Sequence, residues 1–309
     1  MNDKKILSLL PAATEIVCAL GLSDNLVGIS HECDFPDHIR NRPVCTSSKV
    51  DSEAGSAAID SQVKDLLSRA LSVYDLDIAL IRELKPDIII TQSQCAVCAV
   101  SLSDVESELA GILDKAVTVI SLEPRTLADI LSDIRRVGRV LEADDRADSM
   151  LEELEERINI IRHKLKFIED RPVIACVEWL SPMMLAGNWT PGLVDIAGGS
   201  TKLVEDGQHT PFIEFEQVKA MNPDVIVIMP CGFSIAQTLK EINLLLELPG
   251  WSGLAAVQNN RVYIADGNHY FNRSGPRIVD SIEILAEIIH PKQFVFGYEG
   301  SGWIRFNVS

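Results

Sequence analysis

The sequence predicts an α/β protein of two Rossmann-like lobes, each built on a parallel sheet, joined by one long rigid helix. Short runs of β-branched residues, bounded by turn signals, alternate with helical patterns, which is typical of buried parallel strands. The pattern also recurs along the chain. IRELKPDIIITQ (Ile81–Gln92) and VKAMNPDVIVIMP (Val218–Pro230) each contain a helix end, a Pro-Asp turn and an apolar strand. We expect lobes at 1–123 and 170–309, with a helical connection at 124–169.

Composition agrees with a globular protein of two domains. The chain has 309 residues, of which 47% are hydrophobic and 24% charged. The formal net charge of −17 argues against a nucleic-acid partner, because phosphate binding needs a basic face. No apolar run reaches the roughly 18 residues that a membrane-spanning helix needs. Seven cysteines form no regular framework, which is typical of a reducing compartment. We expect a monomer.

The first element, within KKILSLLPAATEIVCALGLSD, can be interpreted as a secretory leader or as folded structure. Pro11 and Glu15 interrupt the apolar run that a leader requires, whereas Pro is favoured in a first helical turn and Gly just past a helix end. The segment is therefore predicted to form a strand at Ile6–Leu10 and a helix from Pro11 to Gly21. If Met1 is the native N-terminus, we expect the protein in the cytoplasm. If the chain is the mature form left after removal of a leader, we expect it in the periplasm.

The connection between the lobes is predicted to be helical because its apolar residues keep helical spacing. Leu127, Ile130, Ile134, Val137 and Leu141 lie on one stripe. A break is expected at 143–145, and the pattern then resumes to about residue 168. This second helix would be roughly 36 Å long at 1.5 Å per residue, which favours a rigid strut over a flexible linker.

Candidate site residues follow the predicted strands, because ligands of parallel sheets bind beyond the carboxyl ends of the strands. This rim is rich in aromatic and sulfur-containing side chains, which suits a large, flat, partly apolar ligand. Its members are His31 and Phe35 after LVGIS, Gln94, Cys95 and Cys98 after DIIIT, Trp179, Asn188 and Trp189 after VIACV, Phe233 after VIVIM, and His269, Tyr270 and Phe271 after RVYIAD. The motifs GxSxG, GxxxxGK[ST] and HExxH are absent from the sequence, so no enzymatic activity is predicted.

Several of these residues also have other interpretations. Cys95 and Cys98 form a CxxC pair that could bind metal, cycle between thiol and disulfide, or simply be buried in a loop. A thiol-based metal or redox site would join them to His31 and Cys231. A zinc site needs about four ligands, and no second pair has matching spacing. Trp179 and Trp189 would equally suit an interface between the lobes.

A set of motifs resembles the cobalamin and iron-chelate periplasmic-binding family, the class III substrate-binding proteins of ABC importers. The motifs are SLLPAATEIVCALGL, HECDFP, LKPDIIITQSQCAVCAV, AGNWTPGLVDIAGG, MNPDVIVIMPCGF and the segment from LPGWSGLAAV to AEIIHP. They extend over nearly the whole chain, from Lys5 to Pro291, and look most similar to cobalamin-binding members. The resemblance implies two lobes bridged by one helix, non-enzymatic capture of a corrinoid such as cobalamin (vitamin B12) between the lobes, and an ABC importer permease as partner. Family members carry a signal peptide or lipid-attachment cysteine before SLLPAATE, so a chain without one would be a cytosolic corrinoid carrier.

The resemblance also implies roles for the rim residues. Aromatic rings would cover the corrin, and amide side chains would bond its carboxamides. The aromatic set is Phe35, Trp179, Trp189, Phe233, Tyr270 and Phe271, and the amide set is Gln94, Asn188 and Asn272. His31 or His269 would approach the cobalt. Another metal chelate, haem or a siderophore, stays open as an alternative ligand, although an anionic siderophore would favour a more basic rim.

Overall fold

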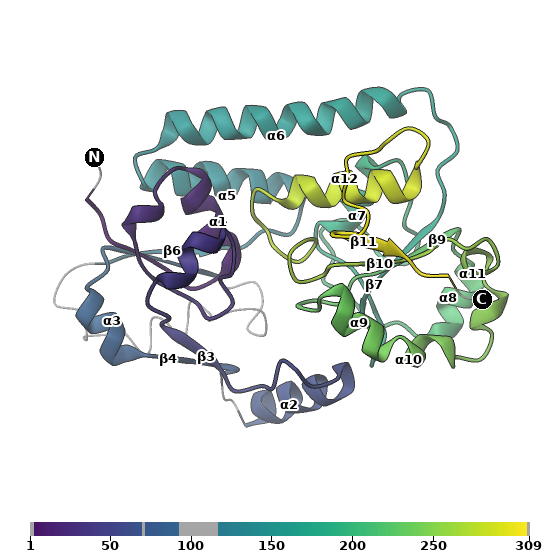
Figure 1. Ribbon diagram of the computed structural model, residues 1–309, viewed down its shortest axis with the longest axis horizontal. Coiled ribbons are helices and arrows are strands. Elements are labelled where there is room, and N and C mark those ends of the chain that lie inside the picture. The colour runs from purple at the N-terminus through teal and green to yellow at the C-terminus, as the bar shows by residue number, and fades with distance from the viewer. Residues whose placement is uncertain (1–2, 70–71, 93–116, 308–309) are drawn as a thin grey trace. The chain divides into compact units, whose positions relative to one another are not determined.

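The computed structural model describes residues 3–69, 72–92 and 117–307. The chain forms two compact units (Figure 1). Unit 1 comprises Met1–Ala54, Ala58–Pro124 and Ala128–Glu152, and unit 2 comprises Gly55–Ala57, Arg125–Leu127 and Glu153–Ser309. Gln94, Cys95 and Cys98 lie outside the described residues.

Unit 1 is built on the parallel sheet that the sequence predicts. Its strands are β1 (Ile6–Ser8), β2 (Leu26–Ile29), β5 (Ile88–Gln92) and β6 (Thr118–Leu122), in the order β2-β1-β5-β6. β1 is buried and pairs with both β2 and β5. It leads into helix α1 (Pro11–Ala19), which has Pro in its first turn and is followed by Gly21 at φ +68°. The predicted strand and helix at the start of the chain are confirmed.

Unit 1 also contains smaller elements. The antiparallel pair of β3 (Thr46–Ser48) and β4 (Tyr74–Leu76) is not predicted from the sequence, because both strands are short and largely polar. Helix α3 (Ile78–Leu84) begins where the Asp77 side chain accepts the Leu80 N–H at 2.9 Å. The described part of unit 1 also contains most of α2 (Ser56–Ser68) and the 3₁₀ turns η1 (Ser23–Asn25) and η2 (Asp37–Asn41).

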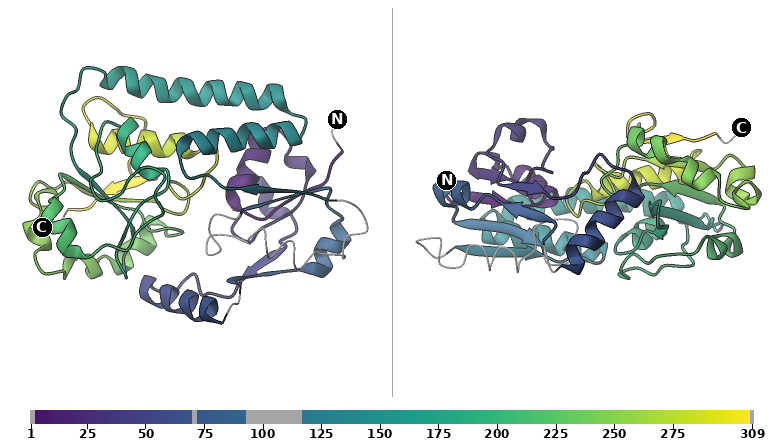
Figure 2. Two further views of the ribbon diagram at one scale, coloured as in Figure 1. Left: turned by 180° about the vertical axis from the view of Figure 1, so that it is seen from behind. Right: turned by 90° about the horizontal axis from the view of Figure 1, so that it is seen from below.

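Unit 2, which the left view of Figure 2 shows from behind, contains a mixed five-stranded sheet in the order β11-β10-β9-β7-β8. The predicted strands β7 (Ile174–Trp179), β9 (Val225–Ile228) and β10 (Val262–Ala265) form its parallel centre. The edge strands β8 (Met184–Leu185) and β11 (Trp303–Arg305) run antiparallel. The predicted parallel sheet is confirmed at its centre, and the two short edge strands were not predicted, because two or three residues carry too little pattern to predict a strand.

Helices cover this sheet. They are α7 (Thr190–Ile196), α8 (Phe215–Met221), α9 (Ile235–Glu241), α10 (Asn243–Leu246), α11 (Ala255–Gln258) and α12 (Ile278–Ile289), with the 3₁₀ turn η3 (Trp251–Gly253). α12 packs against α7 and is buried along most of its length. The sheet core includes Ala175, Val177, Ile226, Ile228, Val262 and Ile264.

The predicted helical connection consists of α5 (Leu127–Val140) and α6 (Asp144–Leu165). α6 has 22 residues, hence a length of about 33 Å. It ends three residues before the predicted position, and the boundary between the two units, Glu152 to Glu153, falls inside it. No helix in the described part of the chain is both long enough and apolar enough to cross a lipid bilayer.

Candidate ligand-binding site

The carboxyl ends of β7, β9 and β10 meet at one edge of the unit 2 sheet. The Cys231 N–H donates to the Glu178 carbonyl at 3.1 Å, which joins the ends of β9 and β7. The N–H groups of Gly267 and Asn268 both donate to the Phe233 carbonyl, at 3.0 and 3.1 Å, which joins the ends of β10 and β9. We call the side chains presented here the strand-end surface: Glu178, Trp179, Asn188, Asn268, His269, Tyr270 and Asn272.

Two aromatic rings of the strand-end surface are partly exposed. Trp179 packs at a tilt against Phe233, with ring centroids 5.3 Å apart. Tyr270 packs edge-on against Tyr298 at 5.9 Å, and the Arg277 guanidinium lies 5.6 Å from its ring centroid. Phe233 itself is 2% exposed, so it supports Trp179 from below.

Trp189 and Phe271 lie beneath the surface rather than on it. Their exposed fractions are 8% and 1%. The Trp189 indole N–H donates to the Phe271 carbonyl at 2.6 Å, and the Phe271 N–H donates to Ser281 Oγ at 2.9 Å. Phe271 has φ +62°, a conformation that a bulky residue adopts only where its surroundings impose it. Predicted direct contacts by Trp189, Phe233 and Phe271 are therefore reinterpreted as support, because the sequence does not reveal that these rings point inward.

The Glu178 carboxylate and the Thr210 hydroxyl meet at the end of β7. Nothing in the sequence predicts this contact. The Thr210 hydroxyl contacts both oxygens of the half-buried Glu178 carboxylate, at 3.1 and 3.2 Å. Thr210 Oγ1 also accepts the Gly187 N–H at 3.1 Å. Asn188 follows at φ +49°, and its N–H donates to the Gln208 carbonyl at 2.5 Å. The backbone hydrogen bond of Asn188 thus holds this residue at the same sheet edge as Trp179.

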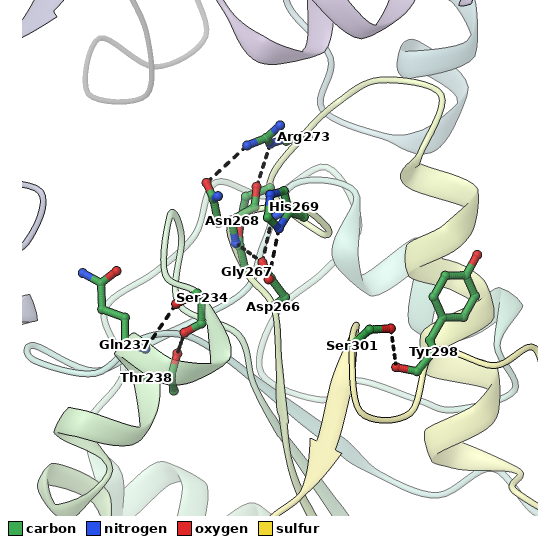
Figure 3. Close-up of polar contacts among 11 residues, drawn as sticks. Ser234, Gln237, Thr238, Asp266, Gly267, Asn268, His269, Arg273, Tyr298 and Ser301 are labelled. Atoms are coloured by element: carbon green, nitrogen blue, oxygen red, sulfur yellow. Dashed lines mark hydrogen bonds and ion pairs between the residues drawn. The ribbon is translucent and has the colours of Figure 1, made fainter. Parts of the chain in front are cut away.

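The loop after β10 is held by its own polar groups (Figure 3). Asp266 Oδ1 accepts the N–H groups of Asn268 and His269 at 3.0 and 2.8 Å, and Asp266 Oδ2 lies 3.1 Å from His269 Nδ1. The buried Arg273 guanidinium donates to the Asn268 carbonyl at 2.6 Å and to its side-chain oxygen at 3.2 Å. The Asn272 amide donates to the Gly267 carbonyl at 2.9 Å. Nothing in the sequence marks Asp266 as this anchor, because its role depends on the path of the loop.

Unit 1 presents its own predicted residues after β2. His31 Nδ1 lies 2.7 Å from Thr46 Oγ1, and its ring packs against Tyr74 with centroids 5.6 Å apart. Desolvation by the surrounding protein lowers the pKa of His31, so the neutral imidazole is favoured near pH 7. Phe35 is 41% exposed. Both side chains are accessible for contact with a ligand.

The thiol hypothesis has limited support from the described residues. Within 3–69, 72–92 and 117–307, no group of three or more His, Cys, Asp or Glu side chains is placed to hold a metal ion. His31 belongs to unit 1 and Cys231 to unit 2. The CxxC pair itself lies outside the described residues.

Comparison with known proteins identifies relatives over nearly the whole chain. The chain is 24% identical over 299 residues to an uncharacterized ABC transporter substrate-binding lipoprotein, YvrC, of Bacillus subtilis, covering 95% of this chain and 82% of that protein. It is 22% identical over 290 residues to a vitamin B12-binding protein of Vibrio cholerae, covering 91% and 87%. A periplasmic haem-binding protein of Pseudomonas aeruginosa has a similar fold, with a TM-score of 0.70, 18% identity and 94% of each chain covered.

The family model of periplasmic binding proteins matches residues 6–268, which include the predicted strands and much of the strand-end surface. Members of this family are solute-binding proteins rather than enzymes, which agrees with the absence of catalytic motifs. Taken with the two α/β units, the match shows that this chain belongs to the periplasmic binding protein family, as a substrate-binding protein of the class III type.

Proposed function

We propose that this protein binds a corrinoid, a cobalamin or a close relative, through the strand-end surface of unit 2. The observation that carries the proposal is the combination of partly exposed aromatic rings with amide side chains at one sheet edge. Trp179 and Tyr270 supply the rings, and Asn188 and Asn272 supply the amides. Rigid aromatic rings bury a large apolar area at low conformational cost, and a few polar groups fix the orientation of the ligand.

The charge of the surface favours a corrinoid over haem. A corrinoid carries neutral carboxamides at its periphery, whereas haem carries carboxylates. Glu178 and Asp266 add negative charge at the ends of β7 and β10. The Arg273 guanidinium is engaged by Asn268, and Arg277 lies over the ring of Tyr270. Carboxylates accept amide N–H groups but repel propionates, so this surface suits carboxamides better.

From unit 1 we keep His31 and Phe35 as proposed ligand contacts, since both are accessible. Gln94 stays a proposed amide contact.

The names of the relatives support a role in ABC transport, and the name of one specifies vitamin B12. We accordingly propose that the chain delivers its ligand to an ABC importer permease from the outer side of the membrane. Fractionation of the native cells would test the location, and recovery in the cytosol would favour a carrier instead.

Haem is the second candidate ligand, because a solved protein with this fold binds it. Calorimetric titration of the full chain with cyanocobalamin, and in parallel with haemin, distinguishes the two. We expect one cyanocobalamin per chain and much weaker binding of haemin. The reverse order of affinities would overturn the corrinoid assignment.

Variants locate the binding surface. We expect Trp179→Ala and Tyr270→Ala each to weaken cyanocobalamin binding by at least about tenfold, as is typical for a central aromatic contact. The matched control is Phe167→Ala, which removes an aromatic ring that is 85% exposed beyond the end of α6. Equal affinities for all three variants would exclude the strand-end surface as the binding site.

A further inference from the structure

The end of helix α6 and the loop after α12 carry the two most exposed large apolar side chains of the described residues. Phe167 is 85% exposed and Val295 is 88% exposed, whereas no other large hydrophobic side chain of the described residues exceeds 60%. Lys164 Nζ lies 5.3 Å from the ring centroid of Phe294, so the two segments are neighbours within unit 2 (Figure 1). Single exposed apolar residues are normal, but two that protrude from adjacent segments indicate a contact surface.

Basic side chains surround these apolar residues. Arg162 and Lys164 lie in the last turn of α6 and Lys166 follows it, and all three are exposed. Among the described residues, none of the three forms an ion pair. Cations in a last helical turn offset the helix dipole, but Arg171 adds a further cation from beyond the helix. The segment 162–171 thus holds four Lys or Arg and two acidic residues, in a chain whose formal net charge is −17.

A hollow of about 210 Å³ lies beside the end of α6, and its cationic lining comes from Arg162, Lys166 and Arg171. Its acidic lining is Asp195, whose Oδ1 accepts a bond from Arg171 Nη2 at 2.7 Å. Nη2 and Nε of Arg171 also donate to the Gly199 carbonyl, at 2.8 and 3.2 Å, so the guanidinium is fixed in place. A hollow of this size has room for several water molecules and hence for one phosphate group, which guanidinium and ammonium groups bind.

The loop that carries Val295 is also fixed. The buried Glu287 carboxylate accepts the backbone N–H groups of Phe296 and Gly297, the latter at 2.6 Å. The ring of Phe296 stacks on that of the buried Phe294, with centroids 5.7 Å apart. Val295 is therefore presented by a backbone that is already ordered, which lowers the conformational cost of a contact.

We infer that this corner of unit 2 docks on the surface of an anionic phospholipid membrane. The basic corner consists of Arg162, Lys164, Lys166, Phe167, Arg171 and Val295. Its cations meet lipid phosphates, one of them in the hollow, while Phe167 and Val295 enter the boundary between headgroups and acyl chains. A lipid interface deforms around a protruding side chain, whereas a rigid protein partner needs a pocket matched to each. A symmetric contact between two copies would bring like charges together.

The test measures co-sedimentation of the full chain with lipid vesicles. One set of vesicles is phosphatidylcholine alone, and the other is an equal mixture of phosphatidylcholine and phosphatidylglycerol. We expect binding to the mixed vesicles, weakened by added salt because salt screens exposed charges, and little binding to phosphatidylcholine alone. Equal binding to both sets, or binding to neither, overturns the proposal.

A charge reversal locates the contact. Lys166→Glu should weaken binding to the mixed vesicles about 25-fold, because each unit of charge near an anionic surface changes the affinity about fivefold. The matched control is Lys240→Glu, which changes the net charge equally at an exposed lysine in the last turn of α9. Equal losses in the two variants would show that net charge alone governs binding, and the basic corner would then have no special role.

An apolar variant tests insertion. Phe167→Ala should weaken binding to the mixed vesicles about tenfold, because an apolar ring no longer leaves water. Leu239→Ala, which shortens a side chain that is 39% exposed on α9, is its control. Affinity equal to wild type in Phe167→Ala contradicts insertion. Both Lys166→Glu and Phe167→Ala leave the strand-end surface intact, so cyanocobalamin binding should match wild type and confirm that the variants fold.

Two other occupants of the basic corner are distinguished in the same experiment. Inorganic phosphate should displace the protein from vesicles no better than chloride at equal ionic strength. Stronger displacement by phosphate, with Phe167→Ala binding like wild type, would assign the hollow to a free phosphate ion and overturn the membrane contact. Sedimentation velocity should find no dimer that Phe167→Ala dissociates, since such a dimer would assign the corner to a second copy of this chain.

Discussion

At the scale of single residues, Gly267 occupies a position that no side chain can share. A Cβ there would overlap the Pro230 carbonyl oxygen and lie 2.8 Å from that of Met229. Both are backbone atoms, so the ends of β9 and β10 would have to separate. We expect Gly267→Ala to lower the free energy of unfolding by about 1–3 kcal/mol, as overpacking does. Gly253→Ala is the control, because nothing lies within 4 Å of its Cβ position. Equal urea midpoints for the two variants would contradict the close approach.

The buried thiols permit a second prediction at this scale. Burial raises the pKa of Cys176 to about 12 and that of Cys45 to about 11, so both stay protonated at pH 8. The thiolate is the reactive form. We therefore expect neither to react with a maleimide at pH 8 in the native protein, and both to react after denaturation. Mass spectrometry of the labelled peptides would check this, and rapid native labelling of Cys176 would show that β7 is not packed as described.

The sequence predicts which residues follow the strands but not which way they point. Tyr270 and Phe271 are adjacent, yet one is partly exposed and the other is in the core. Phe271 is turned inward by its positive φ, which is fixed by bonds to Trp189 and Ser281. Glu178 and Thr210 are 32 residues apart, so their contact depends on the fold and not on spacing.

At the scale of elements, helix α12 carries a buried carboxylate, Glu283, and a half-buried one, Asp280, and both are paired with Arg157. Arg157 on α6 donates from Nε and Nη2 to Glu283 at 2.9 and 2.6 Å, and from Nη2 to Asp280 at 2.6 Å. Removing the partner of buried charges is costly, since their desolvation is no longer offset. We expect Arg157→Met to lower the free energy of unfolding by about 2–4 kcal/mol. This is less than for a fully buried pair, because the arginine is partly exposed and solvent screens its charge.

The control for Arg157→Met is a variant that breaks an ion pair at the surface. Arg135 and Asp148 lie 3.3 Å apart with both side chains exposed. Such pairs contribute about 0–1 kcal/mol, so Arg135→Met should change stability little. If urea denaturation finds equal losses for the two variants, the α12 carboxylates do not depend on Arg157.

Asp280 gives stability a pH dependence with a definite sign. Desolvation raises the pKa of Asp280, opposed by its bond to Arg157, so the folded chain holds this proton more tightly than the unfolded chain. Raising the pH from the ordinary aspartate pKa, about 3.9, through the folded pKa therefore lowers the free energy of unfolding. We expect wild type to lose stability relative to Asp280→Asn over this window. A difference that stays constant with pH, measured by urea denaturation from pH 3 to 7, would contradict the assignment.

Elements were predicted best where the pattern is long or repeated. The central strands β1, β5, β7, β9 and β10 and the helices α1, α5 and α6 follow the sequence pattern closely. β8 and β11 were missed, because two or three residues at a sheet edge show no alternation that distinguishes them from a loop. The β3–β4 pair was missed for the same reason.

At the scale of the whole molecule, the proposed ligand must stabilise the folded chain. A ligand that binds only the native state adds about 2.7 kcal/mol to the free energy of unfolding at one hundred times its Kd. We expect cyanocobalamin to raise the free energy of unfolding of the wild-type protein by this amount. At the same ligand concentration, the increase should be smaller for Trp179→Ala. Thermal or urea unfolding with and without ligand checks it, and no gain at saturating cyanocobalamin would contradict the proposed function.

The course of α6 also limits how the molecule can be divided. Its first nine residues belong to one unit and the following thirteen to the other, so the boundary lies within a hydrogen-bonded helix and not in a loop. A fragment cut at this boundary would lose part of α6, leaving a helix of nine or thirteen residues, and helices this short are marginal in isolation. Exchange of a unit between relatives would therefore need a crossover inside α6 that keeps its helical register. Few crossovers satisfy this condition. We therefore expect the two units to have been inherited together rather than exchanged separately between relatives.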